Sequence, residues 1–284
     1  MGTPLAKLLL RIWAILVVAF LLFPIAIVCL YAFNPAASVQ SWPLEGLTTK
    51  WFSVALHDQQ MLDALWLSVQ AGLAAMAIAL TLGSLAAFGV HRFRFFGRET
   101  VSFLLVLPIA LPGIITAIAL RSTFVFAGID LSLMTIVTGH ATFCIVVIYN
   151  NVIARLRRSS GSLWEASMDL GAHGWLMFRT VTFPVLSTAV VAGALLAFAL
   201  SFDEVIVTTF LAGAQNTLPL WIFGSLRLGQ NLTEVNAVVF MVILVTVIPV
   251  TISARLAGSG AVGRGGANAA TSTGIATAEA EAMP

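Results

Sequence analysis

Two adjacent carboxylates lie inside a long apolar run of this chain, where a charged side chain is costly. Asp203 and Glu204 fall in the run from Ala189 to Ala212, and helical geometry places them about 21 Å from the beginning of that run. A carboxylate within a membrane span is by default a functional hypothesis. We expect one of the two to attract an ammonium group of a solute. The other would pair with Thr208, with Arg121 or with a neighbouring protein. The structural alternative is that the carboxylates serve only in a gate or in interface pairing.

A second group of polar residues forms a short helix between two apolar runs. Ser162 and Glu165 have the spacing of a capping box, so the helix is expected to begin at Leu163. Gly171 supplies a left-handed stop. Glu165 and Asp169 share one face of this helix. A short, charged helix of this kind is typical of a segment presented to a partner protein, although Glu165 alone could serve only as a cap.

The opposite face of the same helix carries small and apolar residues, and a second short helix follows it. The helical spacing places on this face Leu163, Ala166, Ser167 and Leu170. The second helix is expected around residues 175–178 and runs to Pro184, which restarts the chain into the next apolar run. The whole connection covers residues 154–188.

The elements that must position these residues are membrane helices. Hydrophobic residues make up 60% of the 284 residues and charged residues only 9%, whereas ordinary soluble domains contain about 25% charged residues. Apolar runs of about 20 residues predict transmembrane helices and exclude a β-barrel. The predicted fold is therefore an all-α bundle of six transmembrane helices, with spans at Ile12 to Phe33, Leu67 to Val90, Val101 to Leu120, Leu133 to Ile153, Ala189 to Ala212 and Ala237 to Ser253.

The distribution of lysine and arginine predicts that both termini are cytoplasmic. With the N-terminus inside, eleven basic residues fall in inner segments and only Lys50, Arg121 and Arg227 in outer ones. The net charge of +2 is then an effect of topology and gives no argument for nucleic-acid binding. The first apolar run is longer than a signal-peptide core, so we expect it to remain as a span.

Several further segments carry expectations of their own. The outer segment from Trp51 to Trp66 predicts an amphipathic helix at the membrane interface. Pro108 and Pro112 predict a kink in the third span. Residues 1–257 are expected to form the transmembrane domain, and the Gly- and Ala-rich residues 258–284 a disordered tail without an assigned function.

The remaining candidates for chemistry are weak. Cys29 and Cys144 both lie in predicted spans and have no metal-ligand spacing, so packing is the favoured interpretation. His140 lies in the fourth span, where a hydrogen bond to neighbouring backbone is favoured over a proton relay. Both lysines, Lys7 and Lys50, lack a preceding glycine, so the chain has no GxxxxGK[ST] phosphate loop. No metal site or cofactor is expected in this chain.

The connection between the fourth and fifth spans resembles the EAA motif of type I ABC-importer permeases. The resemblance rests on Glu165, Ala166 and Ser167, on Gly171, and on Pro184 at the usual interval, with Ser167 where the motif has alanine. It implies the type I permease fold over residues 1 to about 256 and a coupling helix that docks on a separate ATPase. Asp169 lies in that helix. ATP and Mg²⁺ would then bind the partner ATPase, and this chain would not be an enzyme.

Two further segments, residues 140–151 and 198–221, resemble the second, PotC-type permease of spermidine/putrescine uptake systems. That resemblance implies import of a polyamine across a bacterial plasma membrane. It also implies a second permease subunit, an ATPase dimer and an extracytoplasmic solute-binding protein as partners. Related permeases for aminophosphonate or ferric ion share the scaffold. A secondary transporter acting alone, which would tolerate loss of Glu165 and Gly171, and a membrane scaffold without transport activity are the alternatives from other classes.

Overall fold

The computed structural model describes residues 4–35, 46–159 and 161–246, and every regular element in these ranges is a helix. The described chain packs as two compact units, one formed by residues up to Ala55 together with those from Asn231 onward, and the other by Leu56–Gln230. Each unit is described by itself. Residues 247–253 of the predicted sixth span and the predicted tail at 258–284 lie outside the described residues.

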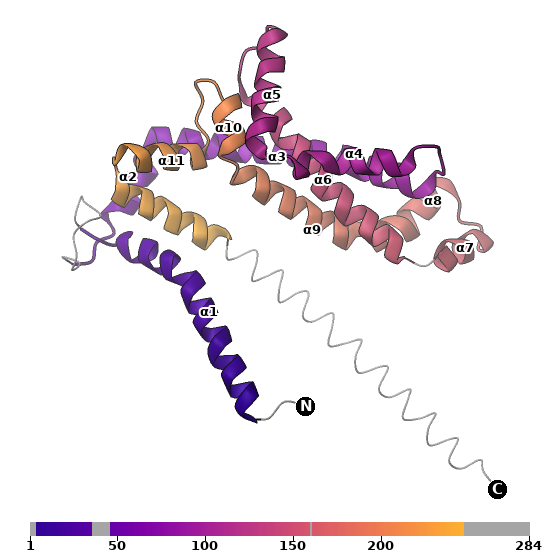
Figure 1. The fold of residues 1–284 in the computed structure, drawn as a ribbon, viewed down its shortest axis with the longest axis horizontal. Helices are drawn as coiled ribbons and strands as arrows, with labels where there is room; N and C mark the ends of the chain where they lie inside the picture. The colour runs from indigo at the N-terminus through magenta and orange to yellow at the C-terminus, as the bar shows by residue number, and fades with distance from the viewer. Residues whose placement is uncertain (1–3, 36–45, 160, 247–284) are drawn as a thin grey trace. The chain divides into compact units, whose positions relative to one another are not determined.

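Three long helices form the core of the larger unit: α3 (Gln59–Arg92), α6 (Leu133–Arg158) and α9 (Phe183–Phe202) pack against one another (Figure 1). Helix α6 is the most enclosed of the three, since 67% of an apolar 18-residue stretch within it is buried. Small residues allow α3 to pack closely against α6, since a Cβ added at Gly83 of α3 would lie 2.8 Å from the carbonyl oxygen of Ile145 on α6. The buried stripe of small residues on α3 comprises Ala64, Ser68, Ala71, Gly72, Ala75, Ala79, Gly83 and Ala87.

The predicted third span is broken into two helices. Helix α4 (Arg98–Ala110) and helix α5 (Gly113–Phe126) are bent by 100° relative to each other, and Figure 1 shows α5 turning away from the line of α4. The expected kink is confirmed, and the bend is sharp enough to divide the predicted span from Val101 to Leu120 into two helices. Pro112 explains the break, because it cannot donate a backbone hydrogen bond and sits as the N-cap of α5.

The predicted fifth span begins and ends earlier than expected. Helix α9 ends at Phe202, and the chain continues through a short break into α10 (Ile206–Leu211). A carboxylate oxygen of Glu204 accepts a hydrogen bond from the backbone N–H of Val207 at 2.9 Å. This side chain competes with the continuing helix for a backbone donor, as acidic residues do at helix starts. After α10, helix α11 (Leu218–Leu228) is tied to α3 by the N–H of Leu218, which donates to the Ser68 hydroxyl at 2.8 Å.

The described residues contain four helices that are long and apolar enough to cross a membrane, or five if the bent pair α4 and α5 is one span. Residues 174–202 count as one of the four because α9 continues without interruption from the connection before it. The predicted sixth span begins within a helix at Leu232–Thr246, which is shorter than a full span over its described length.

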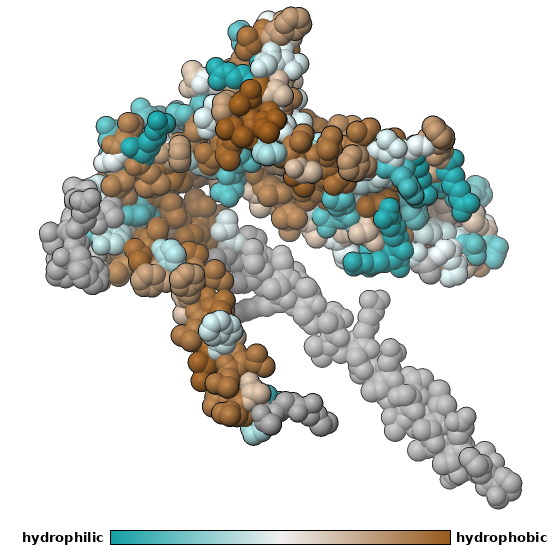
Figure 2. All heavy atoms as spheres, in the orientation of Figure 1, coloured by the Kyte–Doolittle hydropathy of each residue, from teal (hydrophilic) through white to brown (hydrophobic). Residues whose placement is uncertain are grey.

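The smaller unit contains α1 (Pro4–Tyr31), the first residues of α2 (Lys50–His57) and the helix Leu232–Thr246. Three rings hold it together, since the Phe33 ring centroid lies 5.1 Å from that of Phe52 and 5.3 Å from that of Phe240. The indole N–H of Trp51 donates to the carbonyl of Asn34 at 2.9 Å. Helix α1 has no buried residue, and Figure 2 shows it covered by hydrophobic side chains, as expected for a surface facing lipid.

The predicted amphipathic helix between Trp51 and Trp66 is divided by Asp58. The Asp58 carboxylate accepts from the backbone N–H groups of Gln60 at 2.8 Å and Met61 at 3.3 Å, which caps α3. Trp66 therefore belongs to the long span helix and not to a separate interfacial helix. An N-cap carboxylate stabilises the first turn of the helix that follows it, while its own backbone lies outside the helix. Asp58 therefore separates α2 from α3.

Candidate functional site

The short acidic helix of the sequence is α7 (Gly161–Asp169), and Gly171 ends it as predicted. Gly171 has φ +80°, in the left-handed region. Its N–H donates to the carbonyl of Met168 at 2.8 Å, and the N–H of Ala172 donates to the carbonyl of Ser167 at 2.9 Å. These two bonds form a Schellman motif, which satisfies carbonyls that the helix end would leave free.

The start of α7 differs from the expectation. The helix begins at Gly161, so Ser162 lies in its first turn and Leu163 is not its first residue. The reason is the short connection, because α6 extends to Arg158 and α7 follows almost at once. Glu165 is then an exposed residue in the middle of the helix. Capping is therefore not its role in this structure.

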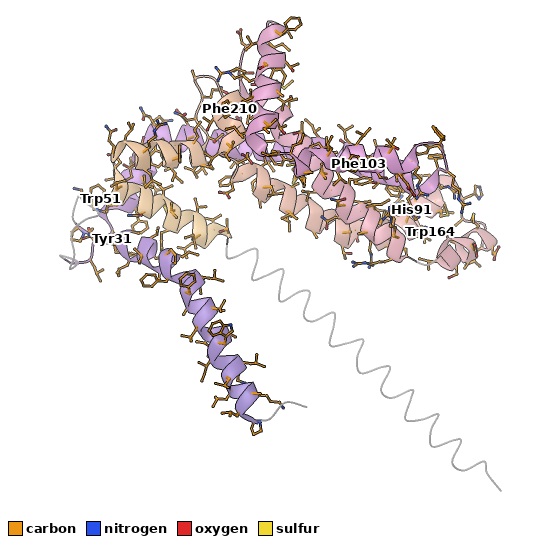
Figure 3. The ribbon with its side chains drawn as sticks, viewed as in Figure 1. Tyr31, Trp51, His91, Phe103, Trp164 and Phe210 are labelled. Atoms are coloured by element: carbon orange, nitrogen blue, oxygen red, sulfur yellow. The ribbon has the colours of Figure 1, made fainter. Side chains whose placement is uncertain are left out.

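The buried face of α7 is formed by Trp164 and Ser167. Ser167 is only 8% exposed and its hydroxyl donates to the carbonyl of Trp164 at 2.8 Å. The Trp164 indole N–H donates to the Thr182 hydroxyl at 3.2 Å, and its ring centroid lies 5.8 Å from that of His91 on α3. Figure 3 shows His91 and Trp164 side by side. These contacts hold α7 against the end of the helical core.

The outer face of α7 is mixed in character. Glu165, Ala166 and Asp169 are exposed, as the sequence pattern indicated for the acidic pair. Leu163 and Leu170, which were placed on the face with Ser167, are exposed as well, by 43% and 89%. The predicted apolar face is thus turned only partly toward the core, because the large Trp164 ring occupies the contact. The exposed part of α7 is therefore an apolar and acidic surface.

The second short helix is confirmed, but it does not end before the fifth span. Helix α8 (Gly174–Met177) passes through a π-helical turn, η1 (Phe178–Thr182), directly into α9. Pro184 lies in the first turn of α9 and therefore does not restart the chain. A wider turn accommodates a proline that lacks an N–H donor and would clash with the preceding turn. Trp175 on α8 is 72% exposed, and α8 contacts α7.

The acidic pair lies at the other end of α9. Asp203 is the C-cap residue of α9 and is exposed, while Glu204 is half-buried in the break before α10. Among the described residues no ion pair joins either carboxylate to Arg121. Thr208 contacts the backbone of Glu204 and not its carboxylate, since the Thr208 hydroxyl donates to the Glu204 carbonyl at 2.6 Å. Of the two side chains, Asp203 is the one left open to a ligand.

His140 joins both sides of this break, which the sequence did not indicate. Its ring is fully buried and lies 2.8 Å from the Ser201 hydroxyl through Nδ1 and 2.9 Å from the Thr208 hydroxyl through Nε2. The Thr208 proton is committed to the Glu204 carbonyl, so Nε2 donates and Nδ1 accepts. The predicted bond to neighbouring backbone was therefore wrong. Two features of the sequence could have indicated this contact. His140 is the one histidine in its span, and hydroxyl residues lie on both sides of the acidic pair in the next span.

Further bonds fix the broken segment to α6. The Thr135 hydroxyl donates to the carbonyl of Leu211 at 2.7 Å, and the Cys144 thiol donates to the carbonyl of Ala197 at 3.3 Å. Cys144 is buried in the main core cluster, as the packing interpretation indicated, and Cys29 is a free, half-buried cysteine. Helix α9 connects the segment of α7 and α8 to the acidic break over 20 residues, or about 30 Å. The two candidate sites are thus the opposite ends of one helix.

Comparison with protein families and characterised proteins gives a consistent result. Residues 79–259, more than half of the chain, match the model of the family described as binding-protein-dependent transport system inner membrane component. The putrescine transport system permease protein PotI of Escherichia coli (strain K12) is 34% identical over 232 residues, covering 79% of this chain and 82% of that protein. The spermidine/putrescine transport system permease protein PotC of the same strain is 32% identical over 240 residues, covering 84% and 90%.

More distant relatives include another solute class and a solved structure. The putative 2-aminoethylphosphonate transport system permease protein PhnV of Salmonella paratyphi A is 26% identical over 241 residues, covering 83% of this chain and 88% of that protein. A crystal structure of a bacterial ABC transporter involved in the import of the acidic polysaccharide alginate contains a chain that matches with a TM-score of 0.66 at 18% identity. The match covers 89% of this chain and 98% of that one. At this identity the structural likeness concerns the fold alone.

Proposed function

Because the chain belongs to the family of binding-protein-dependent transport system inner membrane components, we propose that it is one of two permease subunits of an ATP-driven importer of polyamines. Membership makes it an inner-membrane permease of an ABC importer. The polyamine assignment is carried by one observation, the 32–34% identity to PotC and PotI over most of the chain, against 26% to PhnV. The proposal also includes the partner subunits and the solute.

The partners follow from what the chain presents and what it lacks. Its sequence contains no phosphate loop, so ATP and Mg²⁺ belong on a separate pair of ATPase subunits. A second permease subunit completes the path, and a solute-binding protein delivers the polyamine on the extracytoplasmic side. The excess of basic residues in the segments assigned to the cytoplasm supports the orientation in which α7 faces the ATPase.

The coupling role is assigned to the outer surface of α7 and α8. Leu170 and Trp175 are 89% and 72% exposed. They lie in a connection outside the predicted spans, where exposed large apolar side chains suit a protein interface. Glu165 and Asp169 give the same surface an acidic character. The Schellman stop at Gly171 and the unbroken passage through η1 into α9 provide a stiff route from this surface into the membrane.

The cation-binding role is assigned to the break at the far end of α9. Asp203 is exposed and Glu204 half-buried, and the His140 bridge fixes the backbone on either side of them. A carboxylate held in a partly desolvated position favours an ammonium group over a neutral solute. Movement of α9 during the ATP cycle would change the position of this acidic pair.

Uptake by cells that lack their own polyamine systems tests the assignment. The chain, expressed with its partner subunits, should support accumulation of labelled putrescine or spermidine. Labelled 2-aminoethylphosphonate serves as the competing solute, because one relative carries that name. Uptake of the phosphonate without uptake of either polyamine would reject the polyamine assignment while leaving the permease role intact.

A further inference from the structure

A cavity of about 410 Å³ lies between the coupling loop and the end of α3, away from the acidic break. Its volume falls in the range of about 300–1,000 Å³ typical of small-molecule sites. Most of its wall is apolar and comes from α3, α6, α7 and the α8–η1 segment. The apolar lining residues include Leu85, Phe88, Leu156, Met168, Met177 and Phe178.

The titratable residues in the lining of this cavity are basic. Arg92 and His91 belong to its lining, and the lining includes no carboxylate. The guanidinium groups of Arg92, Arg98 and Arg157 are close enough for their charges to act on the His91 ring. An apolar cavity with basic residues in its lining is complementary to a molecule that has a hydrocarbon chain and an anionic head.

The position of the cavity along α3 points to the membrane surface. Arg92 is the last residue of α3 and follows a continuous apolar helix that is long enough to span a bilayer. The arginines therefore lie at the depth of the lipid headgroups. Basic pockets between membrane helices on the cytoplasmic side bind the headgroups of anionic lipids.

We propose that this cavity binds an anionic phospholipid, with an acyl chain against Phe88 and Phe178 and the phosphate against Arg92, close to Arg98 and Arg157. Trp164 and Met168 of α7 form part of the same wall. The lipid thus joins the coupling helix to α3, and the anionic lipid content of the bilayer sets how firmly α7 is held. This site is independent of which solute is transported.

Lipid retention by the purified full-length chain tests the proposal. In native mass spectrometry, the protein with equal amounts of phosphatidylglycerol and phosphatidylcholine should retain the former. Arg92→Gln should lower phosphatidylglycerol retention about fivefold, the effect expected from one basic residue at an anionic surface. Arg94→Gln is the matched control, because Arg94 lies in the same basic segment but does not line the cavity.

A second variant fills the cavity from inside. Gly89 lines the cavity, and a Cβ added there would meet no atom within 4 Å. Gly89→Leu should therefore fold normally and displace the acyl chain, lowering phosphatidylglycerol retention by at least the same factor. Gly224→Leu is the control, since Gly224 also lies in a helix and has open space around its Cβ position.

The outcomes separate the possible occupants. Equal retention of the two lipids, or unchanged phosphatidylglycerol retention by both Arg92→Gln and Gly89→Leu, would overturn the proposal. Loss of the bound lipid when the chain assembles with its ATPase would also overturn it, because the cavity would then hold a protein partner. Retention in the assembled complex, reduced by both variants and by neither control, is the result that the proposal requires.

Discussion

Replacing Gly171 by valine should uncouple ATP hydrolysis from transport without unfolding the bundle. Gly171 has φ +80°, where a β-branched residue is strained by about 1–2 kcal/mol. A Cβ at this position would meet no atom within 4 Å, so backbone strain is the whole cost and no clash adds to it. A free-energy change of this size shifts the population of the α7 stop by about fivefold to thirtyfold.

The assay compares ATP hydrolysed with solute transported in purified complex. Gly171→Val should hydrolyse ATP with little uptake, or should bind the ATPase weakly, while it reaches the membrane in normal amounts. Gly161→Val is the matched control, because Gly161 lies at the other end of α7, also with open space at its Cβ position and without a left-handed φ. Normal uptake per ATP by Gly171→Val would refute the role of this stop in coupling.

Three further predictions concern the acidic break and the orientation of the chain. Asp203→Asn and Glu204→Gln should each lower polyamine uptake per assembled complex, because loss of an ammonium contact of roughly 1.5–3 kcal/mol lowers the affinity for the polyamine by about tenfold to a hundredfold. Equal uptake by wild type and both variants would exclude a cation site. His140→Ala should lower the thermal stability of the complex because two buried hydroxyls lose their shared partner, at about 1–3 kcal/mol, and an unchanged melting temperature would contradict the bridge. In a background without native cysteines, a cysteine at Asp58 should react with an impermeant thiol reagent added outside and one at Ser162 should not, and the reverse pattern would place α7 on the wrong side for an ATPase.

The sequence predicted the features that depend on local chemistry. The left-handed stop at Gly171 was predictable because few other residues adopt that backbone conformation at low cost. The break near Pro112 followed from the missing N–H of proline. The all-helical membrane fold followed from apolar runs that must satisfy their own backbone hydrogen bonds.

The features that the sequence analysis missed depend on contacts between distant segments. His140 meets Ser201 and Thr208 across 61 and 68 residues, and no local pattern reports such a pairing. The end of α9 at Phe202 was missed because the surrounding apolar run predicts a continuous helix. The break depends on the bond between the Glu204 carboxylate and the backbone N–H of Val207, which the apolar pattern does not indicate. The orientation of α7 was only partly predicted, since helical spacing does not reveal which face a large ring such as Trp164 will turn toward the core.

The most direct test of the account is uptake of labelled spermidine or putrescine by proteoliposomes that contain the complete complex of this chain, its partner permease, its ATPase pair and the solute-binding protein. Uptake should require ATP and should stop when the ATPase carries a substitution in its phosphate loop. Polyamine uptake that proceeds without ATP, or that this chain supports without its ATPase, would contradict the central claim and favour a secondary transporter.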